Sequence, residues 1–255
     1  MNGSSRLSID SARGAPREDW LRAGVLAGFL ATFVMTIALL AGYGLALGIG
    51  DAGGSVLQRW SWALVHNPVA ERTADGVMLA IGANLVMGLI LALAYARFIE
   101  PLLSGPGWWR GVRFALIPWL LSLALFLPLM GGGFFGIGVG GGPLPILGNL
   151  ALHLVYGLVL GGMYALPAMG WLDDTRADRD NAAGAERGAA FGVALGLPAG
   201  FLIGWIIAPG FAGLASRPET AFGLALVGAA IGITIGSFAG MSRSGRQTAN
   251  GVARR

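Results

Sequence analysis

Gly131-Gly-Gly-Phe-Phe-Gly-Ile-Gly-Val-Gly-Gly-Gly-Pro-Leu-Pro145 divides the longest uncharged part of this chain in two. The stretch lies inside residues 114–172, a run of 59 residues that contains no Asp, Glu, Lys or Arg. One membrane-spanning helix needs only about 20 apolar residues, so the run is long enough for two. Because glycine and proline both disfavour a regular helix, the stretch predicts a break between two membrane helices.

Four other uncharged runs occur in the chain, at residues 23–50, 76–96, 188–216 and 220–242. Each is longer than the roughly 18 residues that indicate a membrane span. Charged residues make up 12% of the sequence, which is about half their share in soluble proteins. We therefore predict an all-α, polytopic membrane helix bundle in residues 20–241, with six transmembrane helices at about 21–48, 75–97, 111–130, 146–169, 187–208 and 220–241.

The arginines predict how this bundle is oriented. All 17 basic residues are arginine, and 14 of them fall on one side of the six predicted helices. The other side has only Arg59, Arg72 and Arg217. Since positive flanks favour the cytoplasmic side, we expect a multi-pass protein of the inner (plasma) membrane with both termini in the cytoplasm. The polar tails, residues 1–19 and 242–255, are short and are expected to lack regular structure.

A repeated pattern suggests that the six helices form three two-helix hairpins. The even-numbered helices each carry a glycine followed about seven residues later by an aromatic residue and an alanine, beginning at Gly88, Gly157 and, in a looser match, Gly232. The odd-numbered helices open with an arginine close to a glycine, as in Arg22-Ala-Gly24, Arg110-Gly111 and Arg187-Gly188. The alternative interpretation is that glycine-rich membrane helices resemble one another through composition alone.

The last two predicted helices carry glycine at every fourth position. These glycines are Gly188, Gly192, Gly196, Gly200 and Gly204 in the fifth helix and Gly228, Gly232, Gly236 and Gly240 in the sixth. In lipid, small residues at this spacing let two helix backbones approach closely, which is what drives helix association there. The ladder predicts either packing of the fifth helix on the sixth, or a seam for a homo-oligomer or for other membrane subunits.

Four of the polar residues inside the predicted spans form the candidate site: Asn84, Asn149, His153 and Tyr156. Polar groups are costly in a bilayer, so they mark either structural hydrogen bonds between helices or a functional path. Asn149, His153 and Tyr156 share one helix face. Haem ligation by His153 would need a second axial ligand, and the only other histidine is His66 in a predicted outer loop.

Two outer segments have their own patterns. Residues 131–145 fit either a hydrophobic loop at the membrane interface or a backbone-lined pore segment. Residues 55–66 place Leu57, Trp60 and Leu64 on one helix face, with Ser55 in position to cap the start. This second pattern predicts an interfacial helix, or alternatively a docking surface.

The residue types and motifs that the sequence lacks argue against several classes of function. The chain has no cysteine, no phosphate-binding loop and no zinc-ligand cluster, and no acidic residue interrupts the uncharged core of a predicted span. We therefore expect no enzyme, no metal site and no cofactor. The basic flanks suit anionic lipid headgroups, so the lipid bilayer and not nucleic acid is the expected partner. The first hypothesis is a non-catalytic accessory or scaffold component; the alternative is a permease or channel for a small neutral solute, with its path between the hairpins.

Residues 24–36, Gly-Val-Leu-Ala-Gly-Phe-Leu-Ala-Thr-Phe-Val-Met-Thr, and residues 153–164, His-Leu-Val-Tyr-Gly-Leu-Val-Leu-Gly-Gly-Met-Tyr, carry a resemblance to known sequences. They are similar to segments of six-helix integral membrane proteins of bacteria that are grouped as a domain of unknown function. The resemblance covers about 25 residues. It implies a membrane location and a helix count, and it implies no activity.

Overall fold

The computed structural model describes residues 19–50, 54–166, 176–208 and 218–252. Every regular element in these residues is helical, and none of them forms a strand. Five helices are long and apolar enough to cross a membrane: Trp20–Gly50, Val77–Leu102, Gly107–Leu129, Leu144–Ala165 and Glu186–Ile207. A shorter apolar helical segment, Ala221–Ser237, follows. The chain is therefore a multi-pass membrane protein with an all-α fold, as the sequence predicts.

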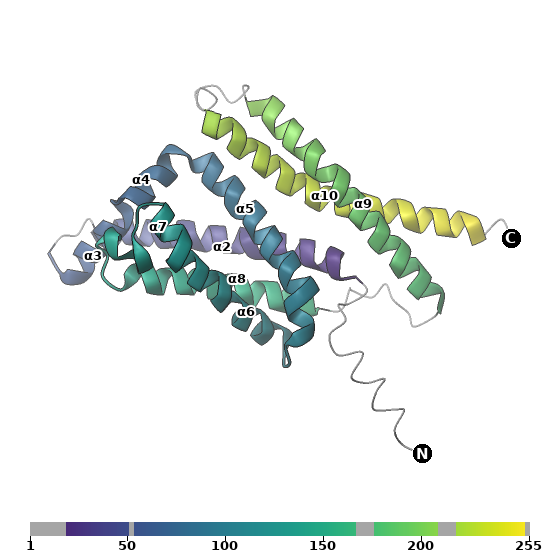
Figure 1. Cartoon of the computed structure of the whole chain (residues 1–255), viewed down its shortest axis with the longest axis horizontal. Coiled ribbons are helices and arrows are strands. Elements are labelled where there is room, and N and C mark those ends of the chain that lie inside the picture. The colour runs from purple at the N-terminus through teal and green to yellow at the C-terminus, as the bar shows by residue number, and fades with distance from the viewer. Residues whose placement is uncertain (1–18, 51–53, 167–175, 209–217, 253–255) are drawn as a thin grey trace, which may run out of the picture.

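The long elements are named as in Figure 1. They are α2 (Trp20–Gly50), α5 (Val77–Ala94), α6 (Gly107–Leu121), α8 (Leu144–Ala165), α9 (Arg176–Ile207) and α10 (Pro218–Val252). The π-helical turn η1 (Tyr95–Ile99) and the 3-10 turn η2 (Glu100–Leu102) extend α5, while the π-helical turn η3 (Ser122–Phe126) and α7 (Leu127–Leu129) extend α6. The remaining short helices are α3 (Val56–Val65), α4 (Pro68–Asp75) and the 3-10 segment η4 (Phe134–Val139).

The predicted boundaries differ from the observed ones mainly in the last two helices. α9 begins at Arg176, eleven residues before the predicted start at 187. α10 continues to Val252, so the carboxyl-terminal tail is helical through residue 252 and the expectation of an irregular tail is wrong there. Both extensions are polar, which is why a search for apolar spans ended the helices too early. Residues 1–18 of the amino-terminal tail, residues 167–169 of the predicted fourth span, Arg217 and residues 253–255 lie outside the described residues.

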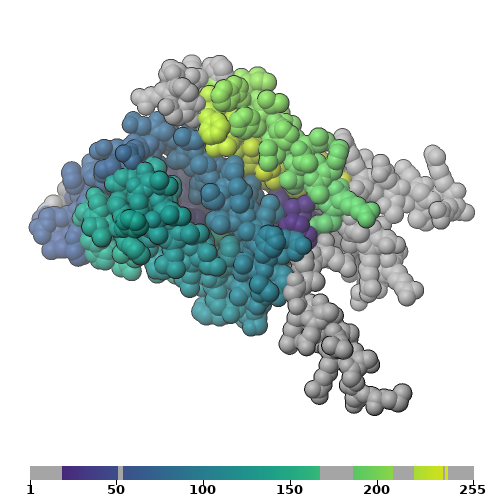
Figure 2. Space-filling view, viewed as in Figure 1, coloured from purple at the N-terminus to yellow at the C-terminus, as the bar shows by residue number. Residues whose placement is uncertain are grey.

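The helices pack in consecutive pairs, α2 with α5, α6 with α8, and α9 with α10. The first two pairs form a four-helix body in which α8 lies against α2. The third pair joins this body through α10, which packs on α5. Figure 1 shows α9 and α10 side by side across one flank, and the space-filling view in Figure 2 places them along one edge of the molecule.

The two helices of each pair meet in the same antiparallel register at small residues. Moving four residues forward along the first helix corresponds to moving four residues backward along the second. At each pairing, a Cβ added to the glycine would come too close to the partner residue. The pairings are Gly24 with Ala96, Gly28 with Ala92 and Thr32 with Gly88; Gly107 with Ala165, Gly111 with Gly161 and Ala115 with Gly157; and Gly188 with Gly240, Gly192 with Gly236, Gly196 with Gly232 and Gly200 with Gly228.

This shared register supports three copies of one hairpin, and it corrects the predicted alignment of the odd-numbered helices. If Gly88 and Gly157 are equivalent, then Gly107 and not Gly111 corresponds to Gly24. The pattern based on Arg110-Gly111 is therefore displaced by one helical turn. The contacts between backbones fix the register of two helices in lipid, whereas a flanking arginine only marks where a helix leaves the apolar layer.

The bundle has two ends, which we name the Trp20 end and the α3 end. The Trp20 end holds the start of α2, the end of α5 and the start of α6; the α3 end holds α3, α4 and η4. At the α3 end the glycine-rich segment folds back against α3 and α4: a Cβ on Gly142 would overlap the Trp60 ring, and one on Gly132 would lie 2.9 Å from Val69. Arg72 donates from Nη1 to the Leu129 carbonyl oxygen over 3.4 Å. Protein therefore covers part of this segment, including Gly132 and Gly136, while Phe134, Phe135 and Ile137 are exposed.

The predicted helix at residues 55–66 is confirmed. α3 begins after Ser55, whose hydroxyl accepts a hydrogen bond from the Gln58 backbone N–H while the Gln58 side chain accepts one from the Ser55 N–H. This reciprocal pair satisfies two backbone donors that a helix start otherwise leaves free. Asn67 caps α4 in turn by accepting from the Val69 and Ala70 N–H groups.

Candidate functional site

The four polar residues predicted as a cluster do not form one continuous strip. Asn84 on α5 donates from Nδ2 to the Thr36 hydroxyl of α2 over 3.0 Å. Asn149 on α8 accepts at Oδ1 from the Ser122 hydroxyl of η3 over 2.8 Å. Each amide is therefore used to join the two helices of one hairpin, the first within α2–α5 and the second within α6–α8.

His153 and Tyr156 are also engaged, each in a different way. Nδ1 of His153 lies 2.9 Å from the Asn149 carbonyl oxygen on the same helix. Since a carbonyl oxygen only accepts, this nitrogen carries the proton and the bond stays within α8. Tyr156 is buried, and its hydroxyl donates over 2.7 Å to the Gly88 carbonyl oxygen of α5.

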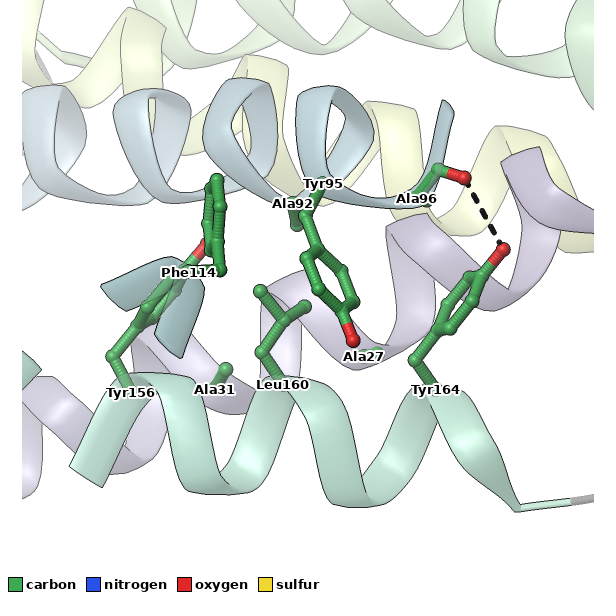
Figure 3. Close-up of a cluster of buried hydrophobic side chains, with 9 residues drawn as sticks. All are labelled: Ala27, Ala31, Ala92, Tyr95, Ala96, Phe114, Tyr156, Leu160 and Tyr164. Atoms are coloured by element: carbon green, nitrogen blue, oxygen red, sulfur yellow. Dashed lines mark hydrogen bonds between the residues drawn. The ribbon is translucent and has the colours of Figure 1, made fainter. Parts of the chain in front are cut away.

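Two tyrosines of α8 join the first hairpin to the second. Tyr156 donates to Gly88, and Tyr164, eight residues later, donates to the Ala96 carbonyl oxygen over 3.4 Å. The acceptors are also eight residues apart, so α8 runs parallel to α5 at a constant offset of 68 residues. Figure 3 shows Tyr164 reaching from α8 to Ala96, with Tyr95 and Leu160 filling the space between. Sequence analysis selected Tyr156 but gave no role to Tyr164, although the repeat pattern contained it.

Tyr95 is the buried polar side chain that this core leaves unsatisfied. It lies in the π-helical turn η1 and is fully buried, and its hydroxyl has no hydrogen-bond partner among the described residues. Its ring packs against Phe114, with centroids 5.1 Å apart, and edge-on against Tyr164 at 5.7 Å. A buried hydroxyl without a partner is uncommon and destabilising, and π-helical turns are frequent at functional sites.

An ion pair at the Trp20 end was not predicted from the sequence. Glu100 of η2 is buried and pairs with Arg110 of α6, while Arg113 donates to the Ser104 carbonyl oxygen of the connection between them. Glu100 lies three residues beyond the predicted end of the second span, so the span pattern predicts no role for it. The available signal was one carboxylate followed ten residues later by an arginine across a short connection.

A second carboxylate connects the third hairpin to the first. Glu186 of α9 accepts a hydrogen bond at Oε1 from the Leu21 backbone N–H over 2.6 Å. Leu21 is in the first turn of α2, where N–H groups have no partner within the helix and where a negative charge is favourable. Sequence reasoning missed this contact because the two residues are 165 positions apart.

The glycines of the ladder pack against one another between α9 and α10. A Cβ added to Gly196 would lie 2.7 Å from the carbonyl carbon of Gly232, and one added to Gly200 would lie 3.0 Å from the Cα of Gly232. Every rung faces backbone, so the predicted intramolecular packing of the fifth helix on the sixth is confirmed. Gly192, Gly200 and Gly204 are buried in this seam, and the other six glycines of the ladder are partly exposed.

One stretch of α2 does have free glycines. Residues 39–45 are all exposed, which over two helical turns means exposure on every side. A Cβ added to Gly42, Gly44 or Gly48 would meet no atom within 4 Å. On the side of α2 away from Ala46 and Gly50, which contact the protein, lie Ile37, Leu40, Ala41, Gly44 and Gly48, and all five are exposed.

No site for a metal ion or haem stands out in the part of the chain that the structure describes. Groups of three or more His, Asp or Glu side chains that could hold a metal ion do not occur there. His66 stacks on Trp62 at the α3 end, with ring centroids 4.2 Å apart. His153 is bonded to its own helix. The two histidines therefore lie on different elements, each with its own partner.

Comparisons with protein-family models, with curated proteins and with solved structures found no match to this chain. The similarity to six-helix bacterial membrane proteins therefore stays a prediction from the sequence.

Proposed function

We propose that this chain is a non-catalytic accessory or scaffold component of a bacterial inner membrane, with both termini in the cytoplasm, and that it binds another membrane subunit through α2. The orientation is supported by the 14 arginines on one side of the predicted helices against three on the other. The Trp20 end is then cytoplasmic, and the α3 end faces outward.

The exposed half of α2 carries the proposal. Lipid-facing helices gain little from association except where small residues allow close approach of the backbones. Each glycine of the α9–α10 seam is already in such a contact, whereas Gly44 and Gly48 are four residues apart on an outward face and touch nothing. Leu40 and Leu45, with 64 and 66% of their surface exposed, flank Gly44 and Gly48. The strip of helix surface at these two glycines is called the α2 groove. A transmembrane helix of a partner fits it by the same small-residue packing that the hairpins use internally.

The alternative, a permease for a small neutral solute, requires polar groups that are free to contact a passing molecule. Asn84, Asn149 and His153 are each bonded to a neighbouring helix or to their own backbone. This arrangement favours the structural interpretation of the polar residues and therefore favours the accessory role over the transport role.

Native mass spectrometry of protein extracted gently from its own membranes tests the proposal. We expect a complex heavier than the 26.2 kDa chain, and we expect Gly44→Leu combined with Gly48→Leu to dissociate it because the leucines fill the groove. Two controls have leucine at open glycines elsewhere: Gly42→Leu, on another face of α2, and Gly148→Leu, on α8 near the same end. Both controls should keep the complex. A monomer in every preparation, or a complex that survives the double substitution, would refute this role.

A further inference from the structure

The start of α6 concentrates positive charge. The helix begins at Gly107 after Pro106, has no capping side chain, and has no acidic residue in its first turn. The free N–H groups at a helix start carry a partial positive charge that favours anions and disfavours arginine. Arg110 and Arg113 nevertheless lie in the first two turns. The sequence thus places two cations where the helix itself asks for a negative charge.

The protein supplies only part of that negative charge. Glu100 pairs with Arg110, and the acceptor that the described residues provide for Arg113 is the neutral Ser104 carbonyl oxygen. Nε of Arg110 and Nε of Arg113 are buried and have no acceptor among the described residues. The hydroxyl of Tyr95, which is fully buried in the turn before Glu100, also has no partner among the described residues. Around the start of α6, the described residues therefore bring together two guanidinium groups and one carboxylate.

We propose that Arg110, Arg113 and the start of α6 bind a phosphate group, supplied either by the headgroup of an anionic phospholipid or by free phosphate. Guanidinium groups bind phosphate oxygens through paired, charge-assisted hydrogen bonds. The Arg110 side chain keeps 22% of its surface exposed, and the bond from Arg113 to the Ser104 carbonyl oxygen is exposed. Basic pockets between transmembrane helices are known to receive anionic headgroups.

The neighbouring aromatic residues fit the lipid source. Trp108 and Trp109 adjoin Arg110, form a tilted pair with centroids 5.6 Å apart, and are 50 and 44% exposed. Exposed tryptophans of this kind anchor membrane proteins at the level of the lipid headgroups. A headgroup beside them is therefore at the depth of Arg110 and Arg113. The inference does not rest on the α2 groove, which lies at the other end of the molecule.

Native mass spectrometry of the delipidated, full-length protein tests the site with three probes: dioleoylphosphatidylglycerol, dioleoylphosphatidylcholine and inorganic phosphate. We expect one phosphatidylglycerol to bind more tightly than phosphatidylcholine, and Arg113→Gln to weaken it about fivefold, the effect of losing one basic contact to an anionic headgroup. Arg72→Gln is the matched control, because Arg72 also bonds a backbone carbonyl but lies at the α3 end. Its phosphatidylglycerol affinity should equal that of the wild type.

The outcomes separate the two sources of phosphate. If inorganic phosphate binds the wild type, displaces phosphatidylglycerol and fails to bind Arg113→Gln, free phosphate is the ligand. If phosphate does not bind but phosphatidylglycerol does, the ligand is the headgroup. A melting temperature that rises with phosphatidylglycerol and not with phosphatidylcholine would also show binding of the anionic headgroup, without any substitution. Equal weakening by Arg113→Gln and Arg72→Gln, or no binding of phosphatidylglycerol and phosphate, would overturn the proposal.

Discussion

Replacing Gly196 with alanine places a methyl group in the seam between α9 and α10. Its Cβ would lie 2.7 Å from the Gly232 carbonyl carbon and 3.3 Å from the Gly236 Cα. Ordinary carbon contacts lie at about 3.5 Å or more, so the contact with this carbon alone requires the helices to separate by roughly 0.8 Å. The Gly232 carbonyl oxygen lies closer still to the added Cβ, so this separation is a lower bound. A gap of that size forfeits about a quarter to a half of each neighbouring dispersion contact. Because the atoms in the way are backbone, no side chain can rotate to make room.

The expected cost is the balance of two effects. Overpacking of a well-packed contact costs about 1–3 kcal/mol, and the seam loses further contacts at its neighbouring rungs. Alanine returns up to about 1 kcal/mol through its better helix propensity. We expect Gly196→Ala to lower the free energy of unfolding by about 2 kcal/mol, measured by titrating the protein in mixed micelles with sodium dodecyl sulfate and following circular dichroism.

A control and a double substitution make this test specific. Gly162→Ala, on α8, meets no atom within 4 Å and should stabilise the protein slightly or leave it unchanged. Gly196→Ala combined with Gly232→Ala should cost less than the sum of the two single changes, because the first methyl already separates the helices. If Gly196→Ala is as stable as Gly162→Ala, the backbone contact that we describe does not hold the third hairpin together.

Three further predictions address other contacts. Tyr156→Phe should lower the free energy of unfolding by about 1 kcal/mol, because the buried bond to Gly88 is lost, whereas Tyr95→Phe should leave the delipidated protein as stable or more stable; equal losses would contradict this difference. Glu186→Ala should lower the free energy of unfolding by about 1 kcal/mol in the same titration, because it removes the acceptor for the Leu21 N–H. An unchanged free energy of unfolding would mean that this contact does not stabilise the fold. A reporter fused to the carboxyl terminus should be active only if it functions in the cytoplasm, and activity of a periplasmic reporter there would reverse the proposed orientation.

The elements that could be predicted from the sequence are those that lipid requires. Long uncharged runs are predicted to be helical because a helix satisfies its backbone hydrogen bonds within one continuous apolar segment, and the break at residues 131–145 follows from glycine and proline. The polar start of α9 and the end of α10 could not be found in this way, because they have no apolar pattern. Their helices continue past the point at which composition gives any signal.

The candidate site was predicted only as a set of residue types. Sequence placed Asn149, His153 and Tyr156 on one face of a helix but could not show which neighbouring helix each one meets. Asn149 meets Ser122, and Tyr156 meets Gly88. These partners depend on how the hairpins are arranged, and that arrangement depends on small-residue contacts between segments far apart in the chain. Glu100 and Glu186 were missed for the same reason, since each is partnered by a residue outside its own helix.

The distribution of glycine within the fold argues where a partner can bind. Close backbone approach is the main source of helix association in lipid, and the third hairpin uses glycine on both helices at each rung from Gly188 to Gly200. A seam made in this way has no side chain with which to adapt, so it is committed to one partner, α10. The first hairpin is different, because Thr32 faces Gly88 there and the contact ends well before the last turns of α2. Beyond it, Gly44 and Gly48 repeat the same spacing with nothing opposite them. A partner helix that supplies its own small residues completes that face without disturbing any contact already made.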